Sequence, residues 1–353
     1  MEPIYQTAIV GTSDGGMRLY KDVPIPEARG SRVIIRTKAV SVNPVDTKMI
    51  GAYVTAGAVG GCDFAGIVEK IAPDATSSSL RVGDRVCTAI MGMNPRDPNV
   101  GAFAEYTSAV EWILLKLPPS MSFEEGAALG ISFMTTGLAL FRSLGIPGYP
   151  LEPSTQQLPV FVFGGSSATG TAAIQLIKLA GFHPVVTCSP HNFDLVKSYG
   201  ASAVFDYQDP ECIQKIKKLT KNGLFYAMDC ISTSDSMKFC YQVLGRAGGK
   251  YTSLEPYSDA VAMTRKVIKP DWVMGPQLMG EEIAWPEPHW RAADPEMAKF
   301  GAAWAVTLGN LLHKGLIRPH PLLIKQGGLS AVLRGIDDVR SKRISGKKLV
   351  YTL

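Results

Sequence analysis

The apolar pattern in the middle of the chain predicts strands that alternate with helices. One short apolar run ends at Gly164 and Gly165, and apolar side chains then recur at helical spacing through Ala173, Ile174 and Ile177. Strands are expected at residues 160–163, 184–187, 203–207, 225–230 and 249–254. Helices are expected between them, at residues 211–219 and 234–244. This order is typical of an α/β domain with a doubly wound parallel sheet.

The N-terminal part of the chain shows a different pattern, with short strands separated by Asn-Pro, Pro-Asp and Gly-Asp turns. These strands are expected at residues 32–38, 64–70, 85–89 and 104–107. They predict a small β-barrel domain. The most apolar stretch, residues 126–141, is interrupted by Ser132, Thr135 and Thr136, so it predicts a buried helix and not a membrane span.

The domain boundaries follow from a proline-rich segment at residues 146–159. We expect a first domain at residues 1–150 and a nucleotide-binding domain at 151–290. A C-terminal segment, 291–353, would hold a helix near 298–314, a segment at 317–323 and a strand at 348–352.

The glycine turn after residue 163 is a candidate pyrophosphate site, because a strand that turns tightly into a helix presents free backbone N–H groups and a positive dipole end. The usual fingerprint has a third glycine where this chain has Ser167 and Ala168. Ser166, Ser167 and Thr169 add hydroxyl groups that a phosphate could use. An ordinary glycine turn in any α/β domain explains the turn itself equally well.

The tip of the next strand favours NADPH over NADH. A carboxylate usually binds the adenosine ribose of NAD at this tip, but residues 188–192 contain none, and the first one is Asp194. Ser189, His191 and Asn192 could donate hydrogen bonds to a 2′-phosphate. Ser189 could also be a helix N-cap with Pro190 in the first helical position, and both roles are compatible.

Composition indicates a globular enzyme of two domains. Of the 353 residues, 46% are apolar and 19% are charged, which provides a full core and argues against disorder. No apolar run reaches membrane-spanning length and the N-terminus lacks a signal-peptide pattern. The net charge of +5 is modest. The lysines at 215, 217, 218 and 221 indicate a solvated helix face, or a surface for an acidic partner, and nothing indicates nucleic acid.

The cysteines and histidines argue against a metal site. The six cysteines form no Cys-x-x-Cys pair, and all five histidines lie beyond residue 150. We therefore expect no metal. Six unpaired cysteines point to a reducing compartment, so we expect a cytoplasmic protein.

Four segments that precede the glycine turn carry a resemblance to a known superfamily. They are residues 43–48, 61–68, 82–86 and 101–106, which read Asn-Pro-Val-Asp-Thr-Lys, Gly-Cys-Asp-Phe-Ala-Gly-Ile-Val, Val-Gly-Asp-Arg-Val and Gly-Ala-Phe-Ala-Glu-Tyr. In this order they resemble the medium-chain dehydrogenase/reductases, in the zinc-free quinone-oxidoreductase-like branch. The resemblance implies a GroES-like barrel, a Rossmann domain, and a C-terminal segment that returns to complete the first domain.

A narrower resemblance is to the fungal trans-acting enoyl reductases of iterative polyketide synthases, of the lovastatin-pathway type. It is carried by residues 187–195, 226–231, 245–249 and 271–276. The Ser-Pro-His-Asn-Phe run at 189–193 is the most specific part, because it is no general feature of nucleotide folds. The Ser167-Ala168 departure belongs to the pattern of this group.

This resemblance implies two sets of binding residues. The cofactor would be contacted by Pro44, Val45, Asp46, Thr47, Gly164, Gly165, Ser166, Ser167, Ala168, Thr169, Ser189, Pro190, His191, Asn192, Tyr207, Leu254, Glu255, Ile344 and Ser345. The substrate would lie along Gly130, Ile131, Ser132, Phe133, Met134, Thr135, Thr136, Gly137, Gly275, Pro276, Gln277, Leu278 and Met279. An ordinary strand-end aromatic is the alternative for Tyr207.

The chemistry of enoyl reduction points to three catalytic candidates. Hydride reaches the β-carbon of an unsaturated thioester, negative charge builds on the thioester oxygen, and the α-carbon is then protonated. Lys48 is the first candidate, as enolate stabiliser or as an anchor of the nicotinamide ribose; a surface lysine is the alternative. Thr135, with Thr136, comes second, against a threonine that bonds its own helix. Tyr53 is a third candidate, as proton donor or simply as a pocket aromatic.

The expected function is reduction, with NADPH, of a polyketide enoyl thioester on the acyl carrier domain of a partner synthase or synthase–peptide synthetase hybrid. The reaction would belong to secondary metabolism, and the resemblance suggests a monomer. Two alternatives remain open: a quinone or enone reductase of free small molecules, and a catalytically silent NADPH-binding partner protein.

Overall fold

The computed structural model describes residues 5–51, 53–72 and 80–353. It divides into two compact units, the first made of Met1–Met134 with Pro276–Leu353 and the second of Thr135–Gly275. The chain enters the second unit after Met134 and leaves it after Gly275. Both points lie before the domain boundaries expected at residues 150 and 290. The roles assigned to these domains stay a prediction.

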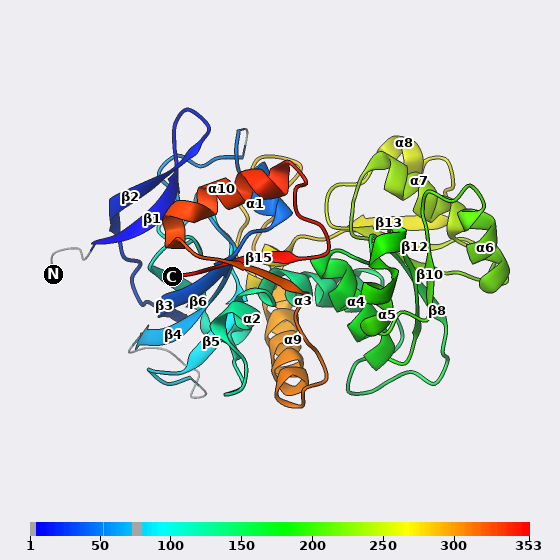
Figure 1. The fold of residues 1–353 in the computed structure, drawn as a ribbon, viewed down its shortest axis with the longest axis horizontal. Coiled ribbons are helices and arrows are strands. Elements are labelled where there is room, and N and C mark those ends of the chain that lie inside the picture. The colour runs from blue at the N-terminus through cyan, green and yellow to red at the C-terminus, as the bar shows by residue number, and fades with distance from the viewer. Residues whose placement is uncertain (1–4, 52, 73–79) are drawn as a thin grey trace. The chain divides into compact units, whose positions relative to one another are not determined.

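The second unit is built on a parallel sheet of six strands in the order β10-β9-β8-β11-β12-β13 (Figure 1). Its strands are β8 (Pro159–Phe163), β9 (His183–Thr187), β10 (Ala203–Phe205), β11 (Tyr226–Asp229), β12 (Gly249–Ser253) and β13 (Ile268–Trp272). Every neighbouring pair is parallel. Numbered from β8, the order is 3-2-1-4-5-6, which confirms the doubly wound Rossmann arrangement.

The helices of the second unit are η2 (a π-helix, Leu138–Ser143), α4 (Ala168–Leu179), η3 (Pro190–Asn192), α5 (Phe193–Ser198), α6 (Cys212–Leu219), α7 (Ser234–Val243) and α8 (Asp259–Ala262). Of these, α4, α6 and α7 lie where the apolar periodicity predicts a helix. α4 packs on β8 and β9, and α7 packs on β11 and α6. Phe161, Tyr241 and Tyr251 lie in the core between these layers and are almost fully buried.

The first unit contains a two-stranded sheet, β1-β2, and a seven-stranded sheet with the order β14-β15-β3-β4-β5-β7, in which β6 also pairs with β3. The strands are β1 (Tyr5–Gly11), β2 (Met17–Pro24), β3 (Arg32–Ser41), β4 (Asp63–Ile71), β5 (Arg85–Ala89), β6 (Tyr106–Val110), β7 (Leu115–Lys116), β14 (Leu322–Lys325) and β15 (Lys348–Thr352). β15 pairs antiparallel with β3, so the last strand of the chain belongs to the sheet of the first unit.

Among its described residues, the first unit alone contains α1 (Pro44–Lys48), η1 (Glu111–Ile113), α2 (Phe123–Ala127), α9 (Pro295–His313) and α10 (Gly328–Arg340). Two more, α3 (Gly130–Gly137) and η4 (Gly275–Met279), contain the points where the chain passes between the units. α2 packs on β3, β4 and β5, and α10 packs on β15 and α1 (Figure 1). In the described part of the chain, no helix is both long enough and apolar enough to cross a membrane.

The prediction of one buried helix at residues 126–141 is wrong in its continuity. The stretch covers the end of α2, all of α3 and the start of the π-helix η2. The break has a local cause: the N–H group of Ile131 donates to the carboxylate of Asp63, 2.6 Å away, and not to a carbonyl of a preceding helical turn. A side chain from the sheet thus begins a new helix.

Candidate functional site

The glycine turn connects β8 to α4 at the carboxyl edge of the parallel sheet. Gly164 has a φ of +78°, which a residue with a side chain rarely adopts. A Cβ on Gly165 would lie 1.9 Å from the Cγ1 of Val186 on β9. The two glycines therefore let the backbone turn within van der Waals distance of the neighbouring strand.

Ser167 closes this turn and begins the helix. Its hydroxyl oxygen accepts from the Gly170 N–H (3.0 Å) and donates to the Gly164 carbonyl (2.8 Å). The N–H groups of Ala168 and Thr169, in the first turn of α4, have no acceptor within the helix. Together with the helix dipole they provide a site for an anion such as a pyrophosphate.

The tip of β9 carries no carboxylate, as the sequence indicates. Ser189 is the N-cap of η3 with Pro190 at its start, but its side chain makes no capping hydrogen bond. His191 is exposed, and its Nε2 lies 3.2 Å from the Nδ2 of buried Asn192. Asp194 points into solvent, 3.9 Å from Lys197. The tip therefore offers a hydroxyl, an imidazole and an amide.

Two other expected cofactor contacts lie at the same edge of the sheet. The ring of Tyr207 is 39% exposed and lies 5.8 Å from the ring of Phe163, the last residue of β8. Leu254 and Glu255 follow β12: the Leu254 N–H donates to Ser232 Oγ (2.9 Å), and the Glu255 carbonyl accepts from Ser253 Oγ (2.8 Å). These bonds fix the backbone that a cofactor would meet.

Asp229, at the end of β11, organises this edge and was not among the predicted residues. Its buried carboxylate accepts hydrogen bonds from the N–H groups of Ile231 and Ser232, from Ser236 Oγ and from Tyr251 Oη, at 2.6–2.9 Å. Burial raises the pKa of Asp229, and the four donors lower it. In the sequence, the signal for Asp229 was a carboxylate at the end of an apolar segment predicted to be a strand.

In the first unit, α1 presents Lys48, the first catalytic candidate. Lys48 is exposed at the end of the helix, and Pro44 is exposed at its start. Val45 and Thr47 are half-buried, and Thr47 Oγ1 donates to the Pro44 carbonyl (2.7 Å). Asn43-Pro44, one of the Asn-Pro turns expected between the N-terminal strands, is therefore the start of a helix.

Asp46 differs from its neighbours on α1 because its carboxylate is fully buried. Oδ2 accepts from the Asn43 N–H (2.7 Å) at the helix start. Burial raises the pKa of Asp46 to about 7, and the Asn43 hydrogen bond and the Lys348 charge lower it. The side chain of Asp46 thus serves its own helix, and its contact with a cofactor stays a prediction.

Tyr53, the third catalytic candidate, belongs to an aromatic cluster of the first unit. Its ring lies 5.1 Å from that of His289 in an edge-on arrangement, and the Trp285 ring lies 6.4 Å from the same His289 ring. Trp285 in turn donates to the Met93 carbonyl (3.0 Å). These contacts fit the pocket-aromatic alternative at least as well as a proton donor.

The expected substrate residues lie on α3 and η4. Ser132 bonds its own helix, at the carbonyls of Ala128 and Leu129. Thr136 Oγ1 instead contacts the Thr169 carbonyl of α4 (3.4 Å). Thr135 is buried, and its Oγ1 would lie 3.0 Å from a Cβ on Gly275, so these two residues are adjacent within the second unit.

The remaining expected residues are placed as follows. On η4, Pro276 and Gln277 are half-buried, whereas Leu278 and Met279 are buried. Ile344 and Ser345 lie just before β15, and Ser345 is exposed.

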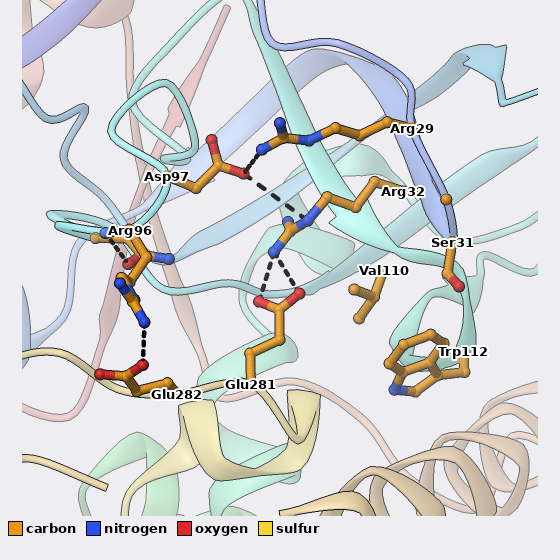
Figure 2. A pocket seen from close by; sticks show the side chains of 11 residues that line it. Arg29, Ser31, Arg32, Arg96, Asp97, Val110, Trp112, Glu281 and Glu282 are labelled. Carbon is orange, nitrogen blue, oxygen red and sulfur yellow. Dashed lines mark hydrogen bonds and ion pairs between the residues drawn. The ribbon is translucent and has the colours of Figure 1, made fainter. Parts of the chain in front are cut away.

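A cavity of about 520 Å³ lies in the first unit and contains none of the predicted site residues. Figure 2 shows Arg32 between Asp97 and Glu281, with Nη2 2.7 Å from a Glu281 oxygen. Arg29 also pairs with Asp97, at 3.3 Å, and Arg96 pairs with Glu282. The wall charges neutralise one another, so the cavity presents no net charge to a ligand.

The comparisons with known proteins agree with this geometry. Residues 29–119 match the alcohol dehydrogenase GroES-like domain, and residues 168–254 match the domain described as zinc-binding dehydrogenase. In the described part of the chain, His, Cys, Asp and Glu form no group of three or more that could hold a metal ion.

Two curated relatives decide the family. The chain is 70% identical to trans-enoyl reductase eqxC of Fusarium heterosporum and 70% identical to trans-enoyl reductase fsa3 of a Fusarium species. Each match covers 99% of this chain and 99% of the relative. The chain belongs to the trans-enoyl reductase family. The sequence resemblance is thereby confirmed.

Solved structures confirm the fold of this trans-enoyl reductase family member. An alcohol dehydrogenase superfamily protein from Novosphingobium aromaticivorans matches with a TM-score of 0.79 at 19% identity, over 99% of this chain and 100% of that one. The CurK enoyl reductase matches with a TM-score of 0.76 at 16% identity, over 98% and 99% of the two chains. At these identities the likeness concerns the fold alone.

Proposed function

We propose that this protein is a trans-acting, NADPH-dependent enoyl reductase. It reduces the α,β double bond of a polyketide thioester that the acyl carrier domain of a partner synthase presents. The observation that carries the proposal is the 70% identity, over 99% of both chains, to a protein named trans-enoyl reductase. The partner, the cytoplasmic location and the role in secondary metabolism follow from that kinship and from the sequence.

The second unit fits a nicotinamide dinucleotide, the cofactor that its alcohol dehydrogenase-type domain implies. The turn leaves no room for a Cβ at Gly164 or Gly165, and the start of α4 offers N–H groups to a pyrophosphate. At the tip of β9, Ser189 has no capping bond, and residues 188–192 contain no carboxylate that would repel a 2′-phosphate. These features support NADPH over NADH.

During the reaction, residues of the chain must bind and orient the thioester and the cofactor, and they must stabilise the negative charge that develops on the thioester oxygen. A bound nicotinamide supplies the hydride. The ammonium group of Lys48 stands on a short helix whose start is fixed by the buried Asp46. It serves either to stabilise the enolate oxygen or to anchor the nicotinamide ribose. In the second unit, the hydroxyl of Thr135, buried beside Gly275, is the second donor that we propose.

The test is NADPH consumption with a short α,β-unsaturated pantetheine thioester, run beside NADH and beside a simple quinone. We expect turnover of the thioester with NADPH and a loss of at least about 100-fold in kcat/KM in Lys48→Ala. Turnover of the quinone alone would place the protein among general quinone reductases. NADPH binding without any turnover would make it a silent partner protein.

The same assay tests the choice of cofactor. Ser189→Asp adds a negative charge where we place the 2′-phosphate, so KM for NADPH should rise about tenfold or more while KM for NADH changes little. Ser198→Asp adds the same charge to the exposed side of α5 and is the matched control. Equal effects of the two variants would contradict the placement of the phosphate.

A further inference from the structure

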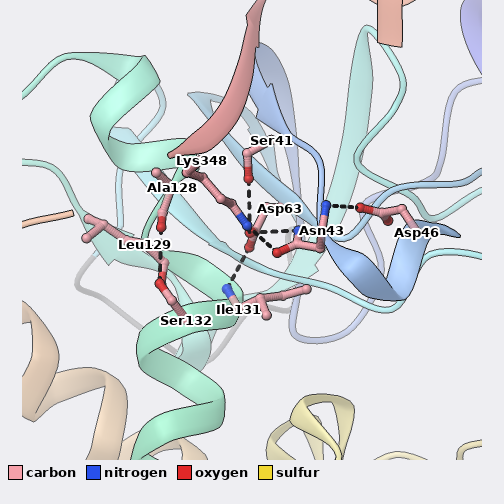
Figure 3. Close-up of polar contacts among 9 residues, drawn as sticks. All are labelled: Ser41, Asn43, Asp46, Asp63, Ala128, Leu129, Ile131, Ser132 and Lys348. Atoms are coloured by element: carbon pink, nitrogen blue, oxygen red, sulfur yellow. Dashed lines mark hydrogen bonds and ion pairs between the residues drawn. The ribbon is translucent and has the colours of Figure 1, made fainter. Parts of the chain in front are cut away.

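Asp63 is the centre of a buried polar network in the first unit, shown in Figure 3. It is the first residue of β4 and has no exposed surface. Oδ1 accepts from the Ile131 N–H at 2.6 Å. Oδ2 accepts from Ser41 Oγ at 3.1 Å, Asn43 Nδ2 at 2.9 Å and Lys348 Nζ at 3.1 Å.

Through these bonds a single carboxylate joins separate segments of the chain. Asn43 is held from both sides, because its amide nitrogen donates to Asp63 and its amide oxygen accepts from Lys348. Asn43 is also the N-cap of α1, and Ile131 lies in the first turn of α3. Asp63 therefore fixes the start of α1 against the start of α3.

The start of α3 is packed onto this carboxylate without any spare room. A Cβ on Gly130 would lie 2.5 Å from Asp63 Oδ1 and 2.5 Å from the backbone of Thr88. A buried ion pair such as Lys348–Asp63 (3.1 Å) is weak evidence for stability, because desolvation opposes the attraction. What the network provides is one defined arrangement of the segments that it joins.

We propose that Asp63 is a positioning residue for enoyl reduction. It touches neither substrate nor cofactor, and it sets the placement of Lys48 on α1 relative to the expected substrate residues at the start of α3. Lys348, at the start of β15, supplies the charge that holds the carboxylate in place and also clamps Asn43. The inference rests on the proposed function, because Lys48 and α3 matter to the rate only if this site performs the reaction.

The test separates positioning from folding by kinetics. Asp63→Asn removes the charge and turns one acceptor into a donor, and we expect kcat to fall about 10- to 100-fold, as small misplacements of reacting groups do. The dissociation constant of NADPH should change little, because the glycine turn and the tip of β9 are intact. With NADPH deuterated at its hydride-donating carbon, the isotope effect on kcat should increase, because hydride transfer becomes rate-limiting.

Two further variants complete the design. Asn43→Ala removes the link between Asp63 and α1 but leaves the Ile131 and Lys348 bonds, so it should give the same kinetic signature in smaller degree. Arg265→Met removes hydrogen bonds to the carbonyls of Leu244 (3.1 Å) and Gly245 (2.7 Å) in the second unit, where no predicted site residue is involved. It should lower the melting temperature but not kcat.

The proposal is overturned if folded Asp63→Asn or Asn43→Ala keeps wild-type kcat and isotope effect, or if Arg265→Met reproduces their signature. Failure of the proposed function is a different result, since it appears in the wild type as no reduction of the enoyl thioester. If the wild type reduces only the quinone, the same variants are compared with that acceptor, and an unchanged kcat again rejects the role of Asp63.

Discussion

Asp46 shows how one buried carboxylate can control the helix that carries the proposed catalytic lysine. It has no exposed surface, and its Oδ2 accepts a hydrogen bond from the Asn43 N–H, 2.7 Å away. The groups that face it include Lys348, Asp63 and the Cys62 thiol. Burial dominates over these neighbours, so the neutral acid is favoured up to about pH 7.

We predict that this residue makes the protein less stable as pH rises. The pKa of Asp46 is about 7 in the folded chain against 3.8 for an ordinary aspartate, so the folded state binds the extra proton between these values. Its contribution is fully present below about pH 4, falls as pH rises and is lost above about pH 7. Between pH 5.5 and 8 the loss is about 2 kcal/mol.

Asp46→Asn keeps the shape and an acceptor oxygen but does not titrate. Urea unfolding of both proteins at pH 5.5 and pH 8 should show the wild type losing more stability with rising pH than the variant. His320, whose pKa burial lowers to about 4, titrates in the opposite sense but is present in both proteins and cancels. Parallel pH profiles would show that Asp46 is ionised throughout this range.

At the scale of the element, the loop after β11 depends on Asp229. Its carboxylate accepts from two backbone N–H groups of the loop, and Ser232 in turn accepts from the Leu254 N–H (2.9 Å) after β12. Ser232 has a φ of +60°, so the loop adopts a conformation that needs this support. One side chain thus shapes the ends of two strands at the proposed cofactor edge.

We predict that Asp229→Ala destabilises the protein by about 3 kcal/mol or more, because it leaves several buried donors without an acceptor. Ser236→Ala removes one of the four bonds and should lose about 1 kcal/mol. Urea unfolding measures both. Under conditions where both variants are folded, Asp229→Ala should also weaken NADPH binding, whereas an equal affinity in wild type and variant would separate this loop from the cofactor site.

The helices and strands predicted correctly from the sequence are elements in which the buried positions are apolar. β5 and β15 were placed at their observed bounds, and α4, α6 and α7 within a few residues. β2 and β13 were missed because they lack that pattern: β2 is largely exposed, and β13 contains Pro270. α10 was also missed, although Leu329, Val332 and Ile336 recur at helical spacing and are buried.

The candidate site, too, was predictable from the sequence only in part. The glycine turn and the tip of β9 are contiguous motifs, so sequence could place them. Asp63 and Asp229 could not be found in this way, because their partners lie far along the chain: Lys348 is 285 residues from Asp63, and Tyr251 is 22 residues from Asp229. Only the folded chain shows which donors meet each carboxylate.

At the scale of the whole molecule, the free edges of the parallel sheet bear on oligomeric state. β13 is an edge strand that pairs with β12 within the described chain. Pro270, in its middle, lacks an N–H group, and Lys269 and Asp271 on either side are exposed. The opposite edge strand, β10, has three residues. Proline, charge and short length are the devices by which proteins prevent pairing of sheet edges.

We therefore predict a monomer of about 38.0 kDa, which light scattering coupled to gel filtration measures over a range of protein concentrations. The double variant Lys269→Val with Pro270→Val restores an N–H group and removes a charge at the edge, so its mass should increase with concentration. A wild-type mass of twice the chain mass would contradict the prediction and point to another surface for self-association. A monomer leaves the whole surface of one chain available to the large synthase that we propose as its partner.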